Sequence, residues 1–399
     1  MNHDFSSLEE IAAARRDAWD TYKTSILNSP ERKGEVDSLR MVYGDATMRY
    51  SCEVKGQPGP HGYPLYIALH GGGATSINES QWNDMKTRYL GSVQNGIYIA
   101  PRGVRDTWNT HSNAESYPLY DRLIENMMVF KNADPNRVYI TGFSAGGDGV
   151  YAITPRMADR FAAANMSAGH PNGVDMRNLY NMPIALQCGQ NDTAYSRNTV
   201  TAQYGIRLQE LARQYPGHFV STTWIHVNGT HNSWQDHDSN RGLKPVIADF
   251  TAWLNGESAQ SLPVNTNAID FVNRYTRNPL PSSVLWDVSA RDGSQGDNLR
   301  TVPSFYWLSV PMNSSGGKIN ASYTRCENKI VVDTEGFPGA LTVLLNEEMV
   351  DPFSPIHLRM NGTTTTHNPA ISGELLTSST RERGDPHYQF IMSITLTAP

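Results

Sequence analysis

The run Gly142-Phe143-Ser144-Ala145-Gly146 has the residue types and spacing that can activate a serine for nucleophilic attack. It follows the apolar run 137–141, which predicts a strand, and it precedes an amphipathic stretch, which predicts a helix. In such a turn the serine hydroxyl is exposed, and glycines avoid collisions with the strand and helix backbones. The helix start would aim free N–H groups at a developing oxyanion. Ser144 is therefore a candidate nucleophile; the alternative is a glycine-rich turn with an incidental serine.

A second glycine-rich run, His70-Gly71-Gly72-Gly73, ends the predicted strand 64–69. A backbone without side chains can approach a substrate carbonyl closely. The run is therefore a candidate for binding such a carbonyl. The alternative interpretation is an ordinary flexible turn.

A nucleophilic serine needs a base, and the base needs an acid that orients it. Asp192 comes just after the predicted strand 183–188, and the ends of parallel strands are where sites gather in open sheets. His231 lies in a loop of small residues after the predicted strand 219–227. We therefore expect Asp192 and His231 to be the acid and the base.

Other residues could fill these two roles. His226 lies within an apolar run, which favours a core position, and His237 lies in the charged run Gln235-Asp236-His237-Asp238, which favours a solvated loop. Asp148 follows Ser144 on the same predicted helix, too close to serve as the acid. These three residues remain the weaker candidates.

Together with Asp134-Pro135-Asn136-Arg137-Val138-Tyr139 and Gly147, these motifs resemble the α/β-hydrolase superfamily. The sequence is most similar to the branch that holds poly(3-hydroxybutyrate) depolymerases, feruloyl esterases and prolyl-oligopeptidase-like enzymes, over roughly residues 40–256. The resemblance implies the chain order serine, acid, histidine, which Ser144, Asp192 and His231 follow. It also implies an oxyanion hole made by the backbone N–H groups of Ala145 and of Gly72 or Gly73.

The elements that must position these residues alternate between short apolar runs and amphipathic stretches. This alternation predicts an α/β fold with a mostly parallel, doubly wound sheet, and helices are expected at 118–130, 146–160, 198–213 and 244–254. After a connector rich in Ser, Asn and Pro, seven short apolar runs predict an all-β, sandwich-like domain. The expected parts are an N-terminal helical segment at 1–39, a catalytic domain at 40–256, a linker at 257–282 and a β-domain at 283–399.

Composition restricts the partners. The chain of 399 residues has 39 acidic and 33 basic residues, a net charge of −6, so it lacks the basic excess typical of proteins that bind nucleic acid or anionic membranes. Three separated cysteines match neither a disulfide framework nor a zinc site. The first residues lack the pattern of a signal peptide, and no apolar run is long enough to span a membrane. We expect a cytoplasmic protein without a metal or organic cofactor.

The predicted function is that of a serine esterase that cleaves a small-molecule carboxylic ester through an acyl-enzyme. Trp108, His170 and Trp234 are candidates for the substrate pocket because they lie in or near loops at strand ends. Alternatives are a peptidase or amidase, for which Arg102 or Arg105 would be the charged anchor, a biosynthetic acyl transferase or cyclase, and a binding protein on a decayed hydrolase fold. The β-domain is a candidate surface for homo-oligomerisation.

Overall fold

The computed structural model describes residues 4–288, 303–312, 314 and 316–397. These residues form two compact units. The large unit holds residues 34–277, and the small unit holds residues 4–33 and 278–288 and the described residues of the range 303–397. Part of the expected β-domain, residues 289–302, 313, 315, 398 and 399, lies outside the described residues.

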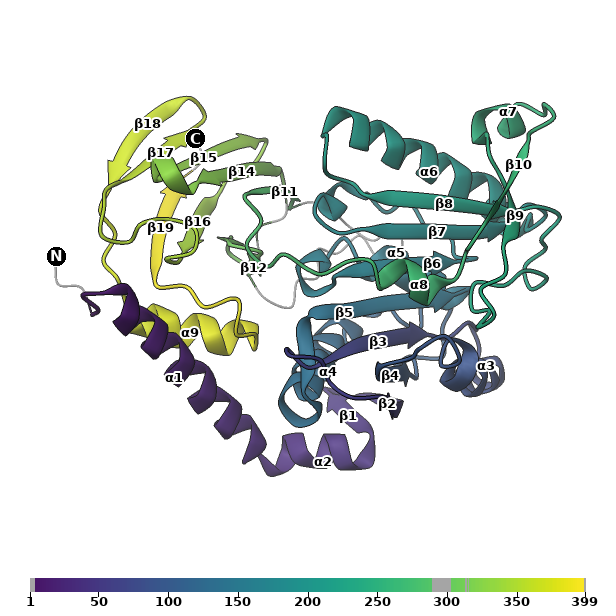
Figure 1. Ribbon diagram of the computed structural model, residues 1–399, viewed down its shortest axis with the longest axis horizontal. Coiled ribbons are helices and arrows are strands. Elements are labelled where there is room, and N and C mark those ends of the chain that lie inside the picture. The colour runs from purple at the N-terminus through teal and green to yellow at the C-terminus, as the bar shows by residue number, and fades with distance from the viewer. Residues whose placement is uncertain (1–3, 289–302, 313, 315, 398–399) are drawn as a thin grey trace. The chain divides into compact units, whose positions relative to one another are not determined.

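A ten-stranded sheet forms the centre of the large unit, in the order β1-β2-β4-β3-β5-β6-β7-β8-β9-β10 (Figure 1). The six strands from β4 to β8 in this order run parallel, and the outer strands pair antiparallel. The strands are β1 (Arg40–Tyr43), β2 (Ala46–Lys55), β3 (Tyr63–Leu69), β4 (Gly96–Pro101), β5 (Ala133–Phe143), β6 (Ala163–Ser167), β7 (Ile184–Gly189), β8 (Ser221–His226), β9 (Lys244–Ile247) and β10 (Ser261–Val264).

Helices cover both faces of this sheet. The helices of the large unit are α3 (Thr75–Arg88), α4 (Ser116–Lys131), α5 (Ala145–Ile153), α6 (Arg197–Gln214), α7 (Phe250–Leu254) and α8 (Ala268–Val272), and short 3₁₀ turns lie at Ala158–Arg160, Arg177–Leu179 and Ala194–Ser196. The helix α2 (Pro30–Ser38) contains the boundary between the two units in the chain. A Cβ atom on Gly149 of α5 would lie 3.1 Å from the side chain of Leu69, whereas α3 and α8 pack in one cluster with Ala68. Because successive strand residues point to opposite faces, α5 lies on the face opposite to α3 and α8.

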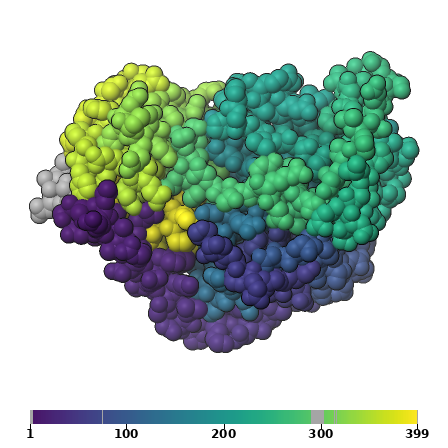
Figure 2. All heavy atoms as spheres, viewed as in Figure 1, coloured from purple at the N-terminus to yellow at the C-terminus, as the bar shows by residue number. Residues whose placement is uncertain are grey.

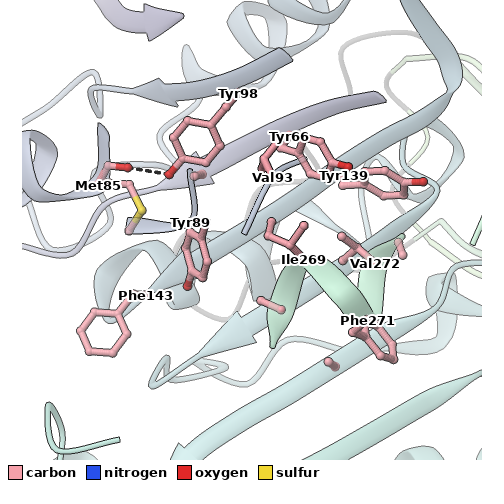
Figure 3. Packing of buried hydrophobic residues seen from close by; sticks show 14 of the residues in the cluster. Tyr66, Met85, Tyr89, Val93, Tyr98, Tyr139, Phe143, Ile269, Phe271 and Val272 are labelled. Carbon is pink, nitrogen blue, oxygen red and sulfur yellow. Dashed lines mark hydrogen bonds between the residues drawn. The ribbon is translucent and has the colours of Figure 1, made fainter. Parts of the chain in front are cut away.

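The face under α3 and α8 is rich in aromatic residues (Figure 3). Tyr66 and Tyr139 pack side by side, with ring centroids 5.3 Å apart, and both side chains are buried. The hydroxyl of Tyr98 donates to the carbonyl of Met85, 2.5 Å away, which fastens α3 to the sheet. These tyrosines bury large apolar surfaces while their hydroxyls find partners at the cluster edge, as buried tyrosines require.

The small unit contains two sheets, in the orders β11-β14-β15-β17-β18 and β12-β13-β16-β19. The sheets touch through Trp286 and Phe305, whose rings stack 5.5 Å apart, and through Trp307 and Tyr323, at 5.8 Å. Apart from the parallel pair β15–β17, the pairings are antiparallel. The strands are β11 (Ser283–Asp287), β12 (Ser304–Phe305), β13 (Leu308–Ser309), β14 (Lys318–Thr324), β15 (Lys329–Glu335), β16 (Ala340–Leu345), β17 (Ile356–Met360), β18 (Thr363–His367) and β19 (Met392–Thr397), with a 3₁₀ turn at Arg325–Glu327.

Two helices complete the small unit, α1 (Leu8–Leu27) and α9 (Gly373–Arg383), which pack against each other. Arg15 of α1 pairs with Glu347 and Glu348 at 2.5 and 2.7 Å, and its carbonyl accepts a hydrogen bond from Gln389 at 2.9 Å. The first helix is therefore part of the same unit as the C-terminal sheets.

The fold class is confirmed: a mostly parallel, doubly wound α/β sheet and separate C-terminal β-sheets. The unit boundaries differ from the expected ones. Residues 257–277 are not a linker, because β10 extends the large sheet and α8 packs against β6 and β7; Figure 2 shows this segment in green at the surface of the large unit. The segment 1–39 is likewise not separate, since its residues 4–33 belong to the small unit.

Two further expectations about elements need correction. The expected helix 244–254 is the strand β9 followed by the short helix α7, because Pro245 and Val246 pair with β10. The small unit is not purely β, since it includes α9. Among the described residues, no helix has both the length and the apolar character needed to cross a bilayer.

Candidate active site

Ser144 stands in a strained turn between β5 and α5. Its backbone has φ 58° and ψ −122°, a conformation that costs about 1–3 kcal/mol for a residue with a side chain. Its N–H donates to the carbonyl of Ser167, 2.9 Å away, which ties the turn to β6. A Cβ atom on Gly146 would lie 2.1 Å from the carbonyl oxygen of Leu69, so only glycine lets α5 start this close to the end of β3. The turn therefore holds Ser144 in one position.

Ser144, His231 and Asp192 form a continuous hydrogen-bonded chain. The Nε2 atom of His231 lies 3.0 Å from the Oγ of Ser144, and its Nδ1 lies 2.7 Å from Oδ2 of Asp192. The carboxylate is an acceptor, so Nδ1 carries the proton and Nε2 is free to accept the serine proton. Asp192 is buried, while the His231 side chain keeps 30% of its surface exposed. The structure thus brings the three predicted residues together from the ends of β5, β7 and β8.

The structure distinguishes between the two candidate N–H donors in the glycine loop after β3. The N–H of Gly73 donates to Oδ1 of Asn78, 2.6 Å away, whereas Gly72 lines the cavity in front of Ser144. Asn78 is fully buried, and its amide donates to Asp106 at 3.0 Å. Ala145, the first residue of α5, lines the same cavity, and helix geometry leaves its N–H without an intrahelical partner. Gly72 and Ala145 are therefore the two expected donors that line the cavity and have no recorded acceptor for their N–H groups among the described residues.

Two buried histidines hold this loop from behind. The Nδ1–H of His70 donates to the carbonyl of Gly71 at 2.6 Å, and its Nε2 accepts the N–H of Gly103 at 3.0 Å. The Nε2–H of His111 donates to the carbonyl of His70 at 2.9 Å. Burial lowers the pKa of His70 to about 4 and the pKa of His111 well below its usual value. Both imidazoles are therefore neutral near neutral pH.

A cavity of about 730 Å³ opens in front of Ser144, a size typical of small-molecule sites. Trp108 and His170 line it, as the sequence indicates. Trp234 lies instead in the core, where its ring stacks on His226 at 4.2 Å and packs near Phe143 at 6.3 Å. The lining residues are Gly72, Trp108, Ser144, Ala145, Asp148, His170, Asn172, Tyr195, Ser196 and Arg197.

The sequence interpretation missed the polar side of this cavity. Asp148, rejected as a catalytic acid, accepts the N–H of His170 at 2.7 Å, and its second oxygen lies 3.4 Å from the amide of Asn172. Burial raises the pKa of the Asp148 carboxyl. Arg197, at the start of α6, is a cavity-lining cation. The only available signal for Arg197 was its place a few residues after Asp192.

The two arginines considered as charged anchors are held by acidic neighbours. Arg102 is buried and pairs with Asp106 and Glu79. Arg105 pairs with Asp45 and Glu115, both at 2.6 Å. These arginines stabilise the loop after β4.

The rival histidines have other partners. His226 is buried, and its Nε2–H donates to Oε1 of Gln187 at 3.0 Å. His237 pairs at 2.9 Å with Asp236, a fully buried carboxylate that also pairs with Arg88 at 2.8 Å. Asp236 thus belongs to a buried polar network, while Gln235 is exposed and the His237 side chain keeps 28% of its surface exposed. Within the described part of the chain, no group of three His, Cys, Asp or Glu side chains is arranged to hold a metal ion.

Comparisons with known proteins give partial likenesses. No family model matches the sequence. A curated protein, the probable feruloyl esterase C of Aspergillus flavus, is 29% identical over 114 residues, which cover 28% of this chain and 41% of that protein. The chain thus spans about two fifths of the length of the curated relative that it matches.

Solved structures similar to this chain include a thermostable esterase, with 20% identity, a TM-score of 0.39, and coverage of 61% of this chain and 64% of that chain. A poly(3-hydroxybutyrate) depolymerase from Bordetella parapertussis is 17% identical with a TM-score of 0.39, covering 58% of this chain and 88% of that chain.

Proposed function

We propose that this chain is a serine hydrolase that cleaves a carboxylic ester through Ser144, His231 and Asp192. The observation that carries the proposal is the unbroken hydrogen-bonded chain from Asp192 through His231 to Ser144 on a strained turn. Nucleophile, base and orienting acid in this geometry are the requirements for covalent acyl transfer. The likeness of part of the chain to a probable feruloyl esterase supports the same reaction class.

In the proposed reaction His231 Nε2 takes the proton of Ser144 as its Oγ attacks the ester carbonyl carbon. The negative charge on the carbonyl oxygen is held by the N–H groups of Ala145 and Gly72, since the N–H of Gly73 is already bonded to Asn78. Collapse of the tetrahedral intermediate breaks the ester bond, and His231 gives the proton to the leaving alcohol. Water, activated by the same His231, then hydrolyses the acyl-enzyme and restores Ser144.

The test is turnover of a p-nitrophenyl ester series, from acetate to octanoate, by the wild type and Ser144→Ala, with aminoacyl p-nitroanilides as the amide comparison. We expect ester turnover that disappears in Ser144→Ala and falls by about 10⁴-fold in Asp192→Asn, which leaves the histidine in the wrong tautomer. His237→Ala is the matched control, because His237 pairs with Asp236.

Turnover that survives in Ser144→Ala would refute the proposal. Faster cleavage of anilides than of esters would instead favour a peptidase. That alternative is weakened by the ion pairs of Arg102 and Arg105, the anchors it would have used. An acyl transferase would be recognised by transfer of the acyl group to an added alcohol in preference to water.

A further inference from the structure

The guanidinium of Arg197 lines the cavity, and most of its N–H donors have no recorded acceptor among the described residues. It has five N–H donors in a planar fork. The hydrogen bond recorded for it among the described residues is a long one of 3.4 Å, from Nη1 to the carbonyl of Ala194. Its Nε is buried and has no hydrogen-bond partner among those residues. The side chain keeps only 14% of its surface exposed, so solvent does not satisfy all of these donors.

The two carboxylates near Arg197 are engaged with other groups. Asp192 accepts from His231 through Oδ2, and its Oδ1 lies 3.7 Å from Nη1 of Arg197, beyond hydrogen-bond distance. Asp148 has both oxygens directed at donors of His170 and Asn172. Arg197 also lies over the ring of Tyr195, at 4.9 Å, which supports the guanidinium without using its N–H groups.

Three arginines of the large unit that lie close to acidic side chains differ from Arg197. Arg88, Arg102 and Arg105 each have a carboxylate within 2.8 Å. The charge of Arg197 is balanced only by the 3.7 Å pair with Asp192 and by the ring of Tyr195, so no hydrogen bond among the described residues offsets the desolvation of its buried Nε–H. A carboxylate in the cavity would accept two parallel N–H bonds from the fork and would remove this cost.

We infer that Arg197 selects ester substrates that carry a free carboxylate. The substrate class is the monoester of a small dicarboxylic acid, or an acyl ester of a hydroxy acid; both present the carboxylate at a short distance from the ester bond. The cavity of about 730 Å³ accommodates molecules of this size. This inference rests on the proposed esterase function and adds a substrate class to it.

The experiment compares each charged ester with its neutral amide of nearly equal size. Monoethyl esters of succinic, glutaric and adipic acids are paired with the corresponding amides, and O-acetyl hydroxy acids are paired with O-acetyl hydroxy amides. Released acid is measured by chromatography, and the readout is kcat/KM for the charged ester divided by kcat/KM for the neutral one. This ratio cancels any general loss of activity that a substitution near Asp192 causes.

We expect the wild type to favour at least one charged ester by about tenfold or more, since hydrogen bonds between an arginine and a carboxylate are charge-assisted and stronger than neutral ones. Arg197→Met should bring that ratio to about one or below, and Arg197→Lys should keep part of it because the charge remains but the fork is lost. The matched control is Arg207→Met on the same helix, since Arg207 is half-exposed and pairs with Asp175 at 3.3 Å. It should keep the wild-type ratio.

The outcomes separate the two ideas. Ser144-dependent turnover of neutral esters without preference for charged ones, or a preference that survives in Arg197→Met, overturns the inference and leaves the esterase function intact. Absence of any Ser144-dependent turnover overturns the proposed function. Calorimetric titration of Ser144→Ala with monoethyl glutarate tests the carboxylate site independently of turnover; binding that Arg197→Met does not weaken in this background also counts against the inference.

Discussion

The buried histidines make the stability of the large unit depend on pH in a predictable direction. Burial lowers the pKa of His70 to about 4, whereas an unfolded chain has a histidine pKa of about 6.5. Between these two values the unfolded chain binds a proton that the folded chain excludes. Stability contributed by the neutral imidazole is therefore fully present above about pH 6.5 and is lost as the pH falls towards 4.

The magnitude follows from the pKa difference. Each pKa unit corresponds to about 1.36 kcal/mol, so the full effect of His70 approaches about 3 kcal/mol, and about 2 kcal/mol of it is lost between about pH 7 and about pH 5. His226, whose pKa burial also lowers to about 4, has the same sign and a similar size. We expect His70→Asn, which keeps a donor for the carbonyl of Gly71, and His226→Gln each to reduce the pH dependence of unfolding by about 2 kcal/mol over this interval.

The assay is urea unfolding, followed by tryptophan fluorescence at several pH values. The quantity compared is the change in unfolding free energy with pH, so a variant that is less stable at every pH still gives an answer. His61→Asn is the control, because His61 is exposed at the surface. The proposed pH effect of these histidines is refuted if the unfolding free energy of His70→Asn and His226→Gln changes with pH as much as that of the wild type. That result would mean that these imidazoles have the same pKa in the folded and the unfolded chain.

Two further substitutions test how the site is positioned. Asn78→Ala removes the acceptor of the Gly73 N–H and should lower kcat by up to about 10²-fold with little change in KM. Asn83→Ala, on the exposed side of α3, is the control and should change neither kcat nor KM. Unchanged kcat in Asn78→Ala would show that the loop needs no such support. Gly146→Ala should lower the free energy of unfolding by about 3 kcal/mol in thermal or urea unfolding, because the new Cβ atom would lie 2.1 Å from the Leu69 carbonyl oxygen. Gly34→Ala is the control, and it should be neutral or slightly stabilising because nothing lies within 4 Å of its Cβ position. Equal stabilities for these two variants would contradict the steric account of the turn.

The sequence predicts the structure best where the backbone geometry and the catalytic role require the same residues. The turn at Ser144 needs glycine on both sides because β5, α5 and the end of β3 approach closely, so the motif and its structure are inseparable. Buried parallel strands appear as continuous apolar runs, and the predicted strands 64–69, 137–141, 183–188 and 219–227 correspond to β3, β5, β7 and β8. Asp192 and His231 could be placed because the ends of parallel strands meet at one edge.

The features that were missed depend on tertiary contacts. Neither α8 nor β10 has a strong periodicity over its few residues, so a segment rich in Asn and Pro was interpreted as a linker although Ile269 and Phe271 are buried in the core. Trp234 was assigned to the pocket from its position near His231. The ring of His226 offers it a stacking partner inside the core, which sequence proximity does not reveal.

For both the glycine loop and Arg197, the possible role of an N–H donor depends on whether it already has an acceptor in the folded chain. Gly72 and Gly73 are equivalent in sequence, and only the hydrogen bond from Gly73 to Asn78 separates them. Arg102 and Arg105 stand out in the sequence as paired cations, yet their donors are directed at carboxylates of their own neighbourhood. Arg197 has no such feature in the sequence, and it is the cation left facing the cavity with donors to give. Recognition of a charged substrate group depends on donors that folding leaves unfilled, and these become visible only when the hydrogen bonds of the folded chain are traced.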